Sequence, residues 1–273
     1  MKVLLECNGK NLELGKKTII MGILNVTPDS FSDGGEYNSI KSADEQCHLM
    51  MREGADIIDI GGESTRPGSK PVTETEEIDR VIPVLKHLKK KFDVFVSIDT
   101  SKAKVAKLAL ENGANMINDV WGLQKEPAIA KHIAEYNVPV VIMHNQENSK
   151  YDLDIIESIK NFFKKSLTIA REAGIKNENI ILDPGIGFGK DSEQNIQVMS
   201  RLDEIKEMGF PLLLGTSRKS MIGYILDLPS DERLEGTLAT NVIGVMNGYD
   251  IIRVHDVKEH VRAMKVTDRI VRR

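Results

Sequence analysis

Short apolar runs that end in polar residues alternate with amphipathic segments along most of the chain. The first run covers residues 18–26 and gives way to Thr27-Pro28, which is typical of a strand buried on both faces. Residues 73–91 instead carry apolar side chains at helical spacing, with lysines on the other face. These two patterns recur to the end of the chain. They predict strands at 18–26, 55–61, 94–99, 115–120, 138–144, 179–183, 211–216 and 250–255, and helices at 73–91, 101–112, 152–173, 191–208, 219–227, 232–247 and 257–272.

Eight predicted strands that alternate with helices indicate an α/β protein built as a (β/α)8 TIM barrel. A doubly wound open sheet is the alternative, and we favour the barrel. Before it, residues 3–7 and 11–14 flank Asn8-Gly9, a dipeptide typical of a tight hairpin turn. We therefore expect a single domain over residues 1–273, with a short N-terminal β-hairpin in 1–17 and the barrel in 18–273.

The composition argues against several classes of protein. Lys and Arg number 37 against 41 Asp and Glu, so the net charge is −4 and no basic footprint indicates nucleic-acid binding. Charged residues come too early for a signal peptide, and no apolar run approaches the ~20 residues of a membrane helix. Cys7 and Cys47 have neither metal nor redox spacing. We expect a cytoplasmic protein that binds neither nucleic acid nor a membrane.

A polar or charged group follows every predicted strand. In a barrel, the carboxyl ends of the strands meet at one rim, where the active site of such folds lies. An Asp or Asn at a strand end often caps the next helix instead. For Asp99 taken alone, a helix cap and a functional carboxylate are about equally good interpretations. Eight strand ends out of eight are harder to explain as capping. The groups are Asn25, Glu63-Ser64-Thr65-Arg66, Asp99, Asn118-Asp119, His144-Asn145, Asp183, Ser217-Arg218-Lys219-Ser220, and Arg253 with His255.

Two of these groups, Asp99 and Asp183, are carboxylates at the mouth of an apolar barrel. An ionised group there needs hydrogen-bond donors to offset its desolvation. The adjacent N–H groups of a flat heterocycle can supply them in pairs, much as a guanidinium does. Asn118 adds one donor and one acceptor. The set favours a purine-like or pterin-like ligand, whereas a metal held by the two carboxylates is the weaker reading, because hard-cation sites gather their carboxylates more closely.

Cationic side chains are expected at the same rim. Arg253 and His255 are two residues apart, so both side chains face the same side of the last strand. Each alone could lie on a solvated edge, but an unpaired cation on a buried strand is costly. We favour an anion site, for a group such as phosphate, made by Arg66, Lys219, Arg253 and His255.

Three glycine-bearing loops follow strands. Gly185-x-Gly187-x-Gly189 lacks the spacing of a dinucleotide-binding fingerprint, so we expect these glycines to turn the backbone and to display Phe188 as an apolar wall. Residues 27–39 and 62–72 are longer and rich in Gly or Pro. Such loops can close as lids that exclude water, and ordinary surface loops are the alternative.

Seven segments together resemble one family, the dihydropteroate synthases among the pterin-binding enzymes. The resemblance runs in order from the first predicted strand to the last and covers nearly the whole chain. The segments are 21–35 (MGILNVTPDSFSDGG), 61–68 (GGESTRPG), 97–100 (SIDT), 117–120 (INDV), 182–190 (LDPGIGFGK), 217–220 (SRKS) and 253–256 (RVHD).

The resemblance implies that 6-hydroxymethyl-7,8-dihydropterin pyrophosphate and 4-aminobenzoate condense to 7,8-dihydropteroate and pyrophosphate, with Mg²⁺ as cofactor and a homodimer as the assembly. It implies catalytic roles for Asp99, Lys219, Arg253 and His255. By the same resemblance the pterin is bound by Asp99, Asn118, Asp183 and Lys219, and the pyrophosphate by Asn25, Thr65, Arg253 and His255. The 4-aminobenzoate would contact Phe31, Thr65, Arg66, Pro67, Phe188 and Ser220, and the metal would be held by Asn25 and Asp33.

One segment departs from the family pattern. After Met143-His144 the relatives carry another Met and then a Gly, whereas this chain has residues 145–148 as Asn-Gln-Glu-Asn. Two alternative functions share the fold. A methyltetrahydrofolate–corrinoid methyltransferase would use the pterin contacts but not the loop at 61–68, and a non-catalytic pterin-binding module would not need the cationic side chains.

Overall fold

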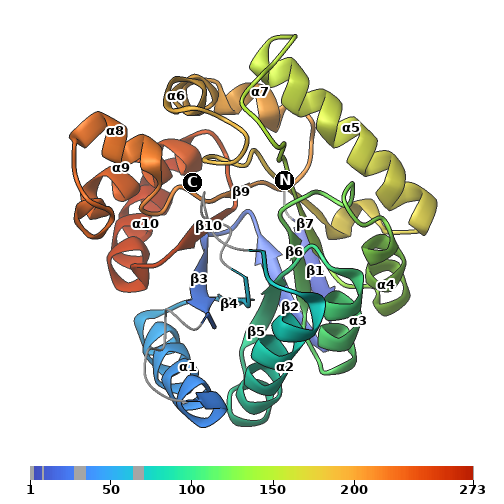
Figure 1. The fold of residues 1–273 in the computed structure, drawn as a ribbon. Helices are drawn as coiled ribbons and strands as arrows, with labels where there is room; N and C mark the ends of the chain where they lie inside the picture. The colour runs from blue at the N-terminus through green and yellow to red at the C-terminus, as the bar shows by residue number, and fades with distance from the viewer. Residues whose placement is uncertain (1–2, 8, 28–34, 64–70, 273) are drawn as a thin grey trace.

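Eight parallel strands form a nearly closed barrel with helices around its outside (Figure 1). The structure is a computed structural model that describes residues 3–7, 9–27, 35–63 and 71–272. The strands of the barrel are β3 (Ile19–Asn25), β4 (Ile57–Gly61), β5 (Phe95–Asp99), β6 (Met116–Asp119), β7 (Val140–Met143), β8 (Ile180–Asp183), β9 (Leu213–Leu214) and β10 (Ile251–Val254).

The order of these strands confirms the predicted barrel. Neighbours in the sheet follow β8-β7-β6-β5-β4-β3-β10-β9, so the only join left is between β8 and β9. There Leu182 and Leu212 form a parallel bridge, and the N–H of Leu182 donates to the carbonyl of Pro211 at 3.0 Å. The strands are apolar and buried almost throughout because helices cover the barrel on the outside while side chains fill its inside.

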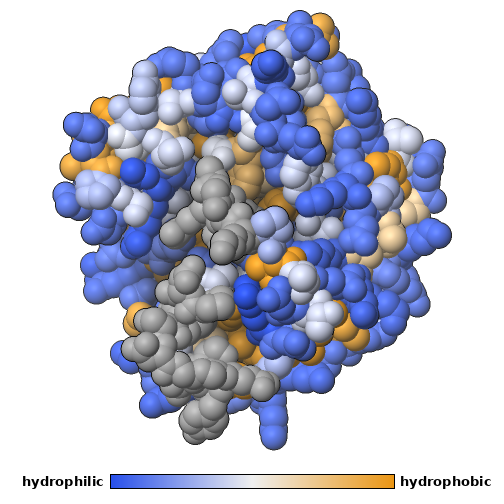
Figure 2. Space-filling model, in the orientation of Figure 1, coloured by the Kyte–Doolittle hydropathy of each residue, from blue (hydrophilic) through white to orange (hydrophobic). Residues whose placement is uncertain are grey.

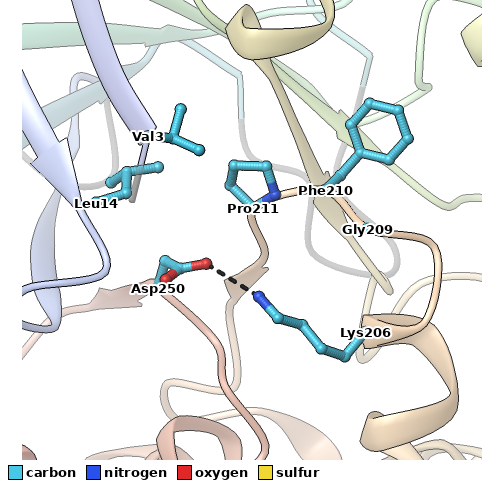
Figure 3. Close-up of a pocket in the computed structure, with 7 residues that line it drawn as sticks. All are labelled: Val3, Leu14, Lys206, Gly209, Phe210, Pro211 and Asp250. Atoms are coloured by element: carbon cyan, nitrogen blue, oxygen red, sulfur yellow. Dashed lines mark hydrogen bonds and ion pairs between the residues drawn. The ribbon is translucent and has the colours of Figure 1, made fainter. Parts of the chain in front are cut away.

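A small antiparallel hairpin, β1 (Val3–Cys7) with β2 (Lys10–Leu14), packs against the amino-terminal end of the barrel. Val3 and Leu14 are buried, and Figure 3 shows them facing Pro211 across a small cavity. Lys206 and Asp250 close its floor with an ion pair of 3.4 Å. The cavity holds about 80 Å³, well below the ~300 Å³ of a small-molecule site. We therefore assign no ligand to it, and the hairpin covers this end of the barrel.

The helices lie between the strands in sequence and outside them in space (Figure 1). In the described part of the chain, no helix is both long and apolar enough to cross a membrane. The helices are α1 (Gly35–Glu53), α2 (Glu74–Lys91), α3 (Ala103–Glu111), α4 (Ala128–Tyr136), α5 (Ile155–Ala173), α6 (Ser192–Ser200), α7 (Leu202–Lys206), α8 (Ser220–Leu226), α9 (Leu234–Met246) and α10 (Val257–Val271), with short 3-10 turns η2 (Asn177–Asn179) and η3 (Ser230–Glu232).

Three of the expected boundaries were wrong, and two helices, α1 and α4, had no counterpart among the predicted ranges. The loop expected at 27–39 is shorter, because α1 begins at Gly35. No helix was expected at α4, whose nine residues bury only Ile129, Ala130 and Ile133. The expected helix 191–208 breaks at Arg201, which lies outside helical conformation with φ −128°. The expected strand 211–216 keeps only two strand residues in β9.

The register of the strands brings separate segments of the chain to one rim. Asn25 is level with Gly61, Gly61 with Asp99, and Asp99 with Asn118. These residues end or nearly end strands β3 to β6, so their backbones form one row across half of the barrel. On the face seen in Figure 2, hydrophilic residues cover most of the surface and hydrophobic ones show mainly between them.

Candidate active site

The row of strand ends places two polar side chains, Asn25 and Asp99, beside one glycine, Gly61. A Cβ atom built on Gly61 would lie 3.7 Å from Oδ1 of Asn25 and 3.8 Å from Oδ2 of Asp99. The next strand adds Asn118, whose amide donates to Oδ2 of Asp59 at 3.1 Å. The absence of a side chain at Gly61 therefore leaves room between the amide of Asn25 and the carboxylate of Asp99.

Arg253 joins this row from the opposite end of the sequence. Its Nε donates to Oδ2 of Asp59 at 2.6 Å, and its Nη2 donates to Oδ2 of Asp99 at 2.8 Å. Asp59 is completely buried and Asp99 is 8% exposed. Burial on its own would lower the pKa of Arg253, but the two carboxylates raise it, so the guanidinium stays charged.

The environment of Asp99 suits a functional carboxylate. Burial raises its pKa to about 7, with Arg253 opposing this rise and Asp59 adding to it. The residue does not cap the next helix, since α3 begins only at Ala103, whose N–H donates to Glu126 at 2.6 Å. The capping alternative is therefore wrong for Asp99, and a carboxyl that titrates near neutrality stands at the mouth of the barrel.

Asp183 ends β8 on the other side of the same mouth. A Cβ atom built on Gly215 would lie 3.8 Å from Oδ2 of Asp183 and 3.9 Å from the Cβ of Arg253. Asp183 Oδ1 accepts the N–H of Gly185 at 2.8 Å, which leaves its second oxygen toward Gly215. Burial raises the pKa of Asp183, while Gly185, Lys219 and other cations oppose this rise.

Lys219 reaches the mouth from the residue just before α8. Its Nζ donates to the carbonyl of Ile186 and lies 4.0 Å from the centre of the Phe188 ring, a cation–π distance. Burial lowers the pKa of Lys219 to about 7, and the charge of Asp183 works against this lowering. Phe188 thus forms an apolar wall beside a cation, as the sequence predicted for its loop.

His255 stands on the same rim, one residue past β10. Its Nδ1 lies 2.9 Å from Oγ of Ser217, and its own N–H donates to that hydroxyl at 3.1 Å. Beside it, Arg218 pairs with Asp256. Ser220 opens helix α8 and is exposed. The final strand and the loop before α8 are therefore held together by polar contacts.

The structure gathers nine of the predicted site residues at one end of the barrel and leaves five undescribed. Phe31, Asp33, Thr65, Arg66 and Pro67 lie outside the described residues. Arg253 was expected to act with His255 on pyrophosphate, but it contacts the carboxylates Asp59 and Asp99 instead. The assignment of Arg253 to pyrophosphate stays a prediction. It requires that the guanidinium contact a phosphate oxygen while it remains paired with Asp59 and Asp99.

Sequence reasoning missed Asp59. The signal was available, since residues 57–61 read Ile-Ile-Asp-Ile-Gly and a carboxylate in the middle of a buried strand needs a partner. Asp59 lies two positions before the end of β4, whereas the predicted site residues follow the strand ends. Lys190 was also given no role, although it lies in the segment 182–190.

The metal assignment has limited support among the described side chains. No group of three or more His, Cys, Asp or Glu there could hold an ion. Mg²⁺ does not require such a group, because it keeps several waters and is bound by one or two protein oxygens plus substrate phosphates. The amide oxygen of Asn25, at the rim beside Gly61, fits as one such ligand. Asp33 lies outside the described residues.

Comparison with known proteins gives full-length matches. The model of a family described as pterin binding enzyme matches residues 21–255. The dihydropteroate synthase of Clostridium beijerinckii is 57% identical over 270 residues, which are 98% of this chain and 100% of that protein. A crystal structure of Clostridium difficile dihydropteroate synthase in the presence of pteroic acid has a TM-score of 0.94 at 56% identity, with 96% of this chain and 100% of that chain covered. Yersinia pestis dihydropteroate synthase with a sulfonamide drug has a TM-score of 0.90 at 45% identity and 98% coverage of each chain.

Proposed function

Because this chain belongs to the family of pterin-binding enzymes, we infer that it is a transferase with dihydropteroate synthase activity. It condenses 6-hydroxymethyl-7,8-dihydropterin pyrophosphate with 4-aminobenzoate and releases 7,8-dihydropteroate and pyrophosphate. The observation that supports this best is the shared mouth of the barrel, where Arg253 contacts Asp99 and lies next to Asp183 across Gly215. Relatives of 46–57% identity over nearly the full chain have this activity.

The pterin would bind through its ring edges. Asp183 keeps one oxygen toward the interior and would accept the 2-amino and N3–H groups, while Lys219 would donate to the O4 and N5 side. Asp59 and Asp99 share one guanidinium, so these three groups carry one negative charge when all are ionised. This net negative charge favours a ring that offers N–H donors. Asn118 can form hydrogen bonds with another edge of the same ring.

The chemistry depends on the leaving group, since an arylamine is a weak nucleophile. We propose a dissociative substitution in which the C–O bond to pyrophosphate breaks early with its electron pair leaving on the pyrophosphate. The nitrogen of 4-aminobenzoate then bonds to the methylene carbon and loses one proton to water. Anionic Asp99 would stabilise the positive charge that develops on this carbon. His255 and Arg253, with Asn25 and Thr65, would hold the departing pyrophosphate.

A bound Mg²⁺, with Asn25 and Asp33 among its ligands, would neutralise charge on the pyrophosphate. The second substrate would lie against Phe188, with Ser220 at the start of α8 and Phe31, Thr65, Arg66 and Pro67 completing its site. The Yersinia pestis enzyme has been crystallised with a sulfonamide drug, and we propose that such drugs take the 4-aminobenzoate place here.

The experiment that tests this function follows pyrophosphate release by the purified protein. With the pterin pyrophosphate, 4-aminobenzoate and Mg²⁺ present, we expect dihydropteroate and pyrophosphate in equal amounts. Omission of 4-aminobenzoate should stop dihydropteroate formation, and a chelator should show whether Mg²⁺ is required. Methyl transfer from methyltetrahydrofolate, or binding of pterin without turnover, would support one of the two alternatives instead.

We further propose that the protein is a homodimer joined through helices α8, α9 and α10. The three helices are neighbours in Figure 1, and α9 packs against both of the others. Each carries large exposed apolar side chains, among them Tyr224 and Ile225 on α8, Met246 on α9, and Val266 and Ile270 on α10. Apolar groups gathered in this way are typical of an interface. A cytoplasmic location stays an expectation from the sequence.

A further inference from the structure

The loop after β8 winds its backbone into a tight coil. Gly185 has φ +67° and Gly187 has φ +83°, both in the left-handed region. A Cβ atom at Gly185 would lie only 1.9 Å from the carbonyl oxygen of His144. This winding turns backbone carbonyl groups inward, away from water, where each needs a donor.

Lys190 supplies donors to the centre of the coil. Its Nζ donates to the carbonyl of Gly185 at 2.9 Å and to the carbonyl of Phe188 at 3.0 Å. It also lies 2.9 Å from Nδ1 of His144. An amine has three N–H groups only when it is protonated, so three acceptors are satisfied together only by the ammonium form. Burial lowers the pKa of Lys190 to about 7, with the charge of Asp183 opposing this, so the ammonium form is present below that pH.

His144 is the neutral partner in this contact. Burial, and then the charge of Lys190, lower the pKa of His144 to about 2, so the ring is uncharged and Nδ1 accepts. The ring is packed against Phe162, with the two ring centres 4.9 Å apart. This packing fixes the position of the His144 ring. The ammonium of Lys190 is therefore held by the imidazole on one side and by the carbonyls of Gly185 and Phe188 on the other.

The same coil forms the seat of Lys219. The carbonyl of Ile186 accepts from Lys219 Nζ, and the ring of Phe188 lies 4.0 Å from that nitrogen. A Cβ atom at Gly187 would lie 2.7 Å from Cδ of Lys219, so the lysine stem runs directly along the coil. Any change in the winding would therefore displace both a predicted pterin ligand and the wall of the predicted 4-aminobenzoate site.

We propose that Lys190 is a positioning residue for the condensation, whose ammonium group holds residues 185–190 in the conformation that seats Lys219 and Phe188. The inference rests on the proposed reaction. It explains why a buried lysine lies outside the substrate contacts yet inside the loop that makes them. Its charge is used to fix backbone carbonyls, and no proton transfer is assigned to it.

The charge of Lys190 has a second consequence, at Asp183. The charged groups that face Asp183 are Lys219 from the start of α8, Lys190 from the coil and Arg253 from β10, and all three lower its pKa against burial. Burial, and then the charge of Asp183, raise the pKa of the Tyr249 hydroxyl, which therefore stays neutral. Removal of the positive charge at Lys190 should raise the pKa of Asp183, and ionised Asp183 is the form that accepts the pterin N–H groups.

The test compares three variants at Lys190 with one control. Lys190→Met keeps the stem without charge, Lys190→Gln keeps two N–H donors without charge, and Lys190→Arg keeps the charge. Lys165→Met removes an exposed lysine of α5 and serves as the control. For each protein, kcat and both KM values are measured between pH 5 and 9.

We expect Lys190→Met to raise the KM for 4-aminobenzoate and for the pterin pyrophosphate at least tenfold, with a smaller fall in kcat. The acid limb of kcat/KM should move to higher pH in Lys190→Met and Lys190→Gln but not in Lys190→Arg, which should recover part of the activity. Lys190→Gln provides the measurement if Lys190→Met does not fold. Wild-type KM values and an unmoved acid limb in both neutral variants would overturn the proposal, even if their melting temperatures fell. Absence of turnover in the wild-type protein would instead count against the proposed reaction.

Discussion

The Nε atom of Arg253 lies 2.6 Å from Oδ2 of Asp59, a carboxylate with no solvent exposure in the interior of strand β4. The Nη2 atom of the same guanidinium lies 2.8 Å from Asp99. Asp59 therefore holds the guanidinium of Arg253 in the position from which it contacts Asp99. Burial raises the pKa of Asp99 to about 7, Arg253 opposes this rise, and the charge of Asp59 adds to it.

Replacement of Asp59 by Asn tests this relationship. Loss of one partner of a buried ion pair costs ~3–5 kcal/mol, and we expect kcat/KM to fall by about two orders of magnitude if most of that cost falls on the transition state. Because the charge of Asp59 raises the pKa of Asp99, the acid limb of kcat/KM near pH 7 should move to lower pH. Asp79→Asn, at an exposed position of α2, is the control. An acid limb that stays in place would rule out the coupling.

Asp99→Asn separates chemistry from binding. If anionic Asp99 stabilises the cationic methylene, kcat should fall by about 10²–10³, while the inhibition constant of pyrophosphate changes only a few-fold. Steady-state kinetics with pyrophosphate as product inhibitor measures both quantities. Equal losses in turnover and in pyrophosphate binding would contradict the assigned role.

The sequence predicted the barrel because the strands are nearly continuous apolar runs and most helices have broad apolar faces. It predicted the candidate site because polar residues followed every strand and the fold requires those ends to converge. Helix α4 was missed although the equally short α3 was predicted, so its length alone does not explain the miss. Strand β9 was overextended because an apolar run does not show how many of its residues pair. The ion pair of Asp59 with Arg253 joins positions 194 residues apart, and no local pattern encodes it.

Lys219→Arg tests the alkaline side of the pH profile. Burial lowers the pKa of Lys219 to about 7, so its charge is lost as the pH rises through that value and kcat/KM should fall with it. A guanidinium stays charged throughout. We expect the variant to have lower activity at pH 7 but a much weaker decline up to pH 9. A wild-type alkaline limb in Lys219→Arg would assign that limb to another group.

Met246→Lys and Ile270→Lys test the proposed dimer surface. These side chains are 65% and 61% exposed on α9 and α10, and a charge in the centre of an apolar interface costs several kcal/mol when unpaired. Sedimentation should find wild-type protein as a dimer and both variants mainly as monomers. Leu153→Lys, at a position 53% exposed before α5, is the matched control and should remain dimeric. A wild-type protein that sediments as a monomer at micromolar concentration would refute the surface.

Thr73→Ala tests the stability of α2. The hydroxyl of Thr73 accepts the N–H of Glu76, and the Glu76 carboxylate accepts the N–H of Thr73, which completes a capping box. Loss of such a cap costs ~1 kcal/mol, so the melting temperature should fall by about 2–4 °C. Thr75→Ala, at the exposed second residue of the same helix, should leave the melting temperature within about 1 °C of wild type, as expected for a surface substitution. Equal effects in the two variants would deny the capping contribution.

The single bridge between Leu182 and Leu212 joins the two ends of the sheet, and Asp183 comes directly after it. Asp183 stands on one side of this join, and Lys219 and Arg253 follow β9 on the other. A ligand that contacts Asp183 together with Lys219 or Arg253 therefore binds only when the two ends of the sheet are joined. Since a ligand that binds one state alone shifts the equilibrium toward that state, a bound pterin should stabilise the join between β8 and β9.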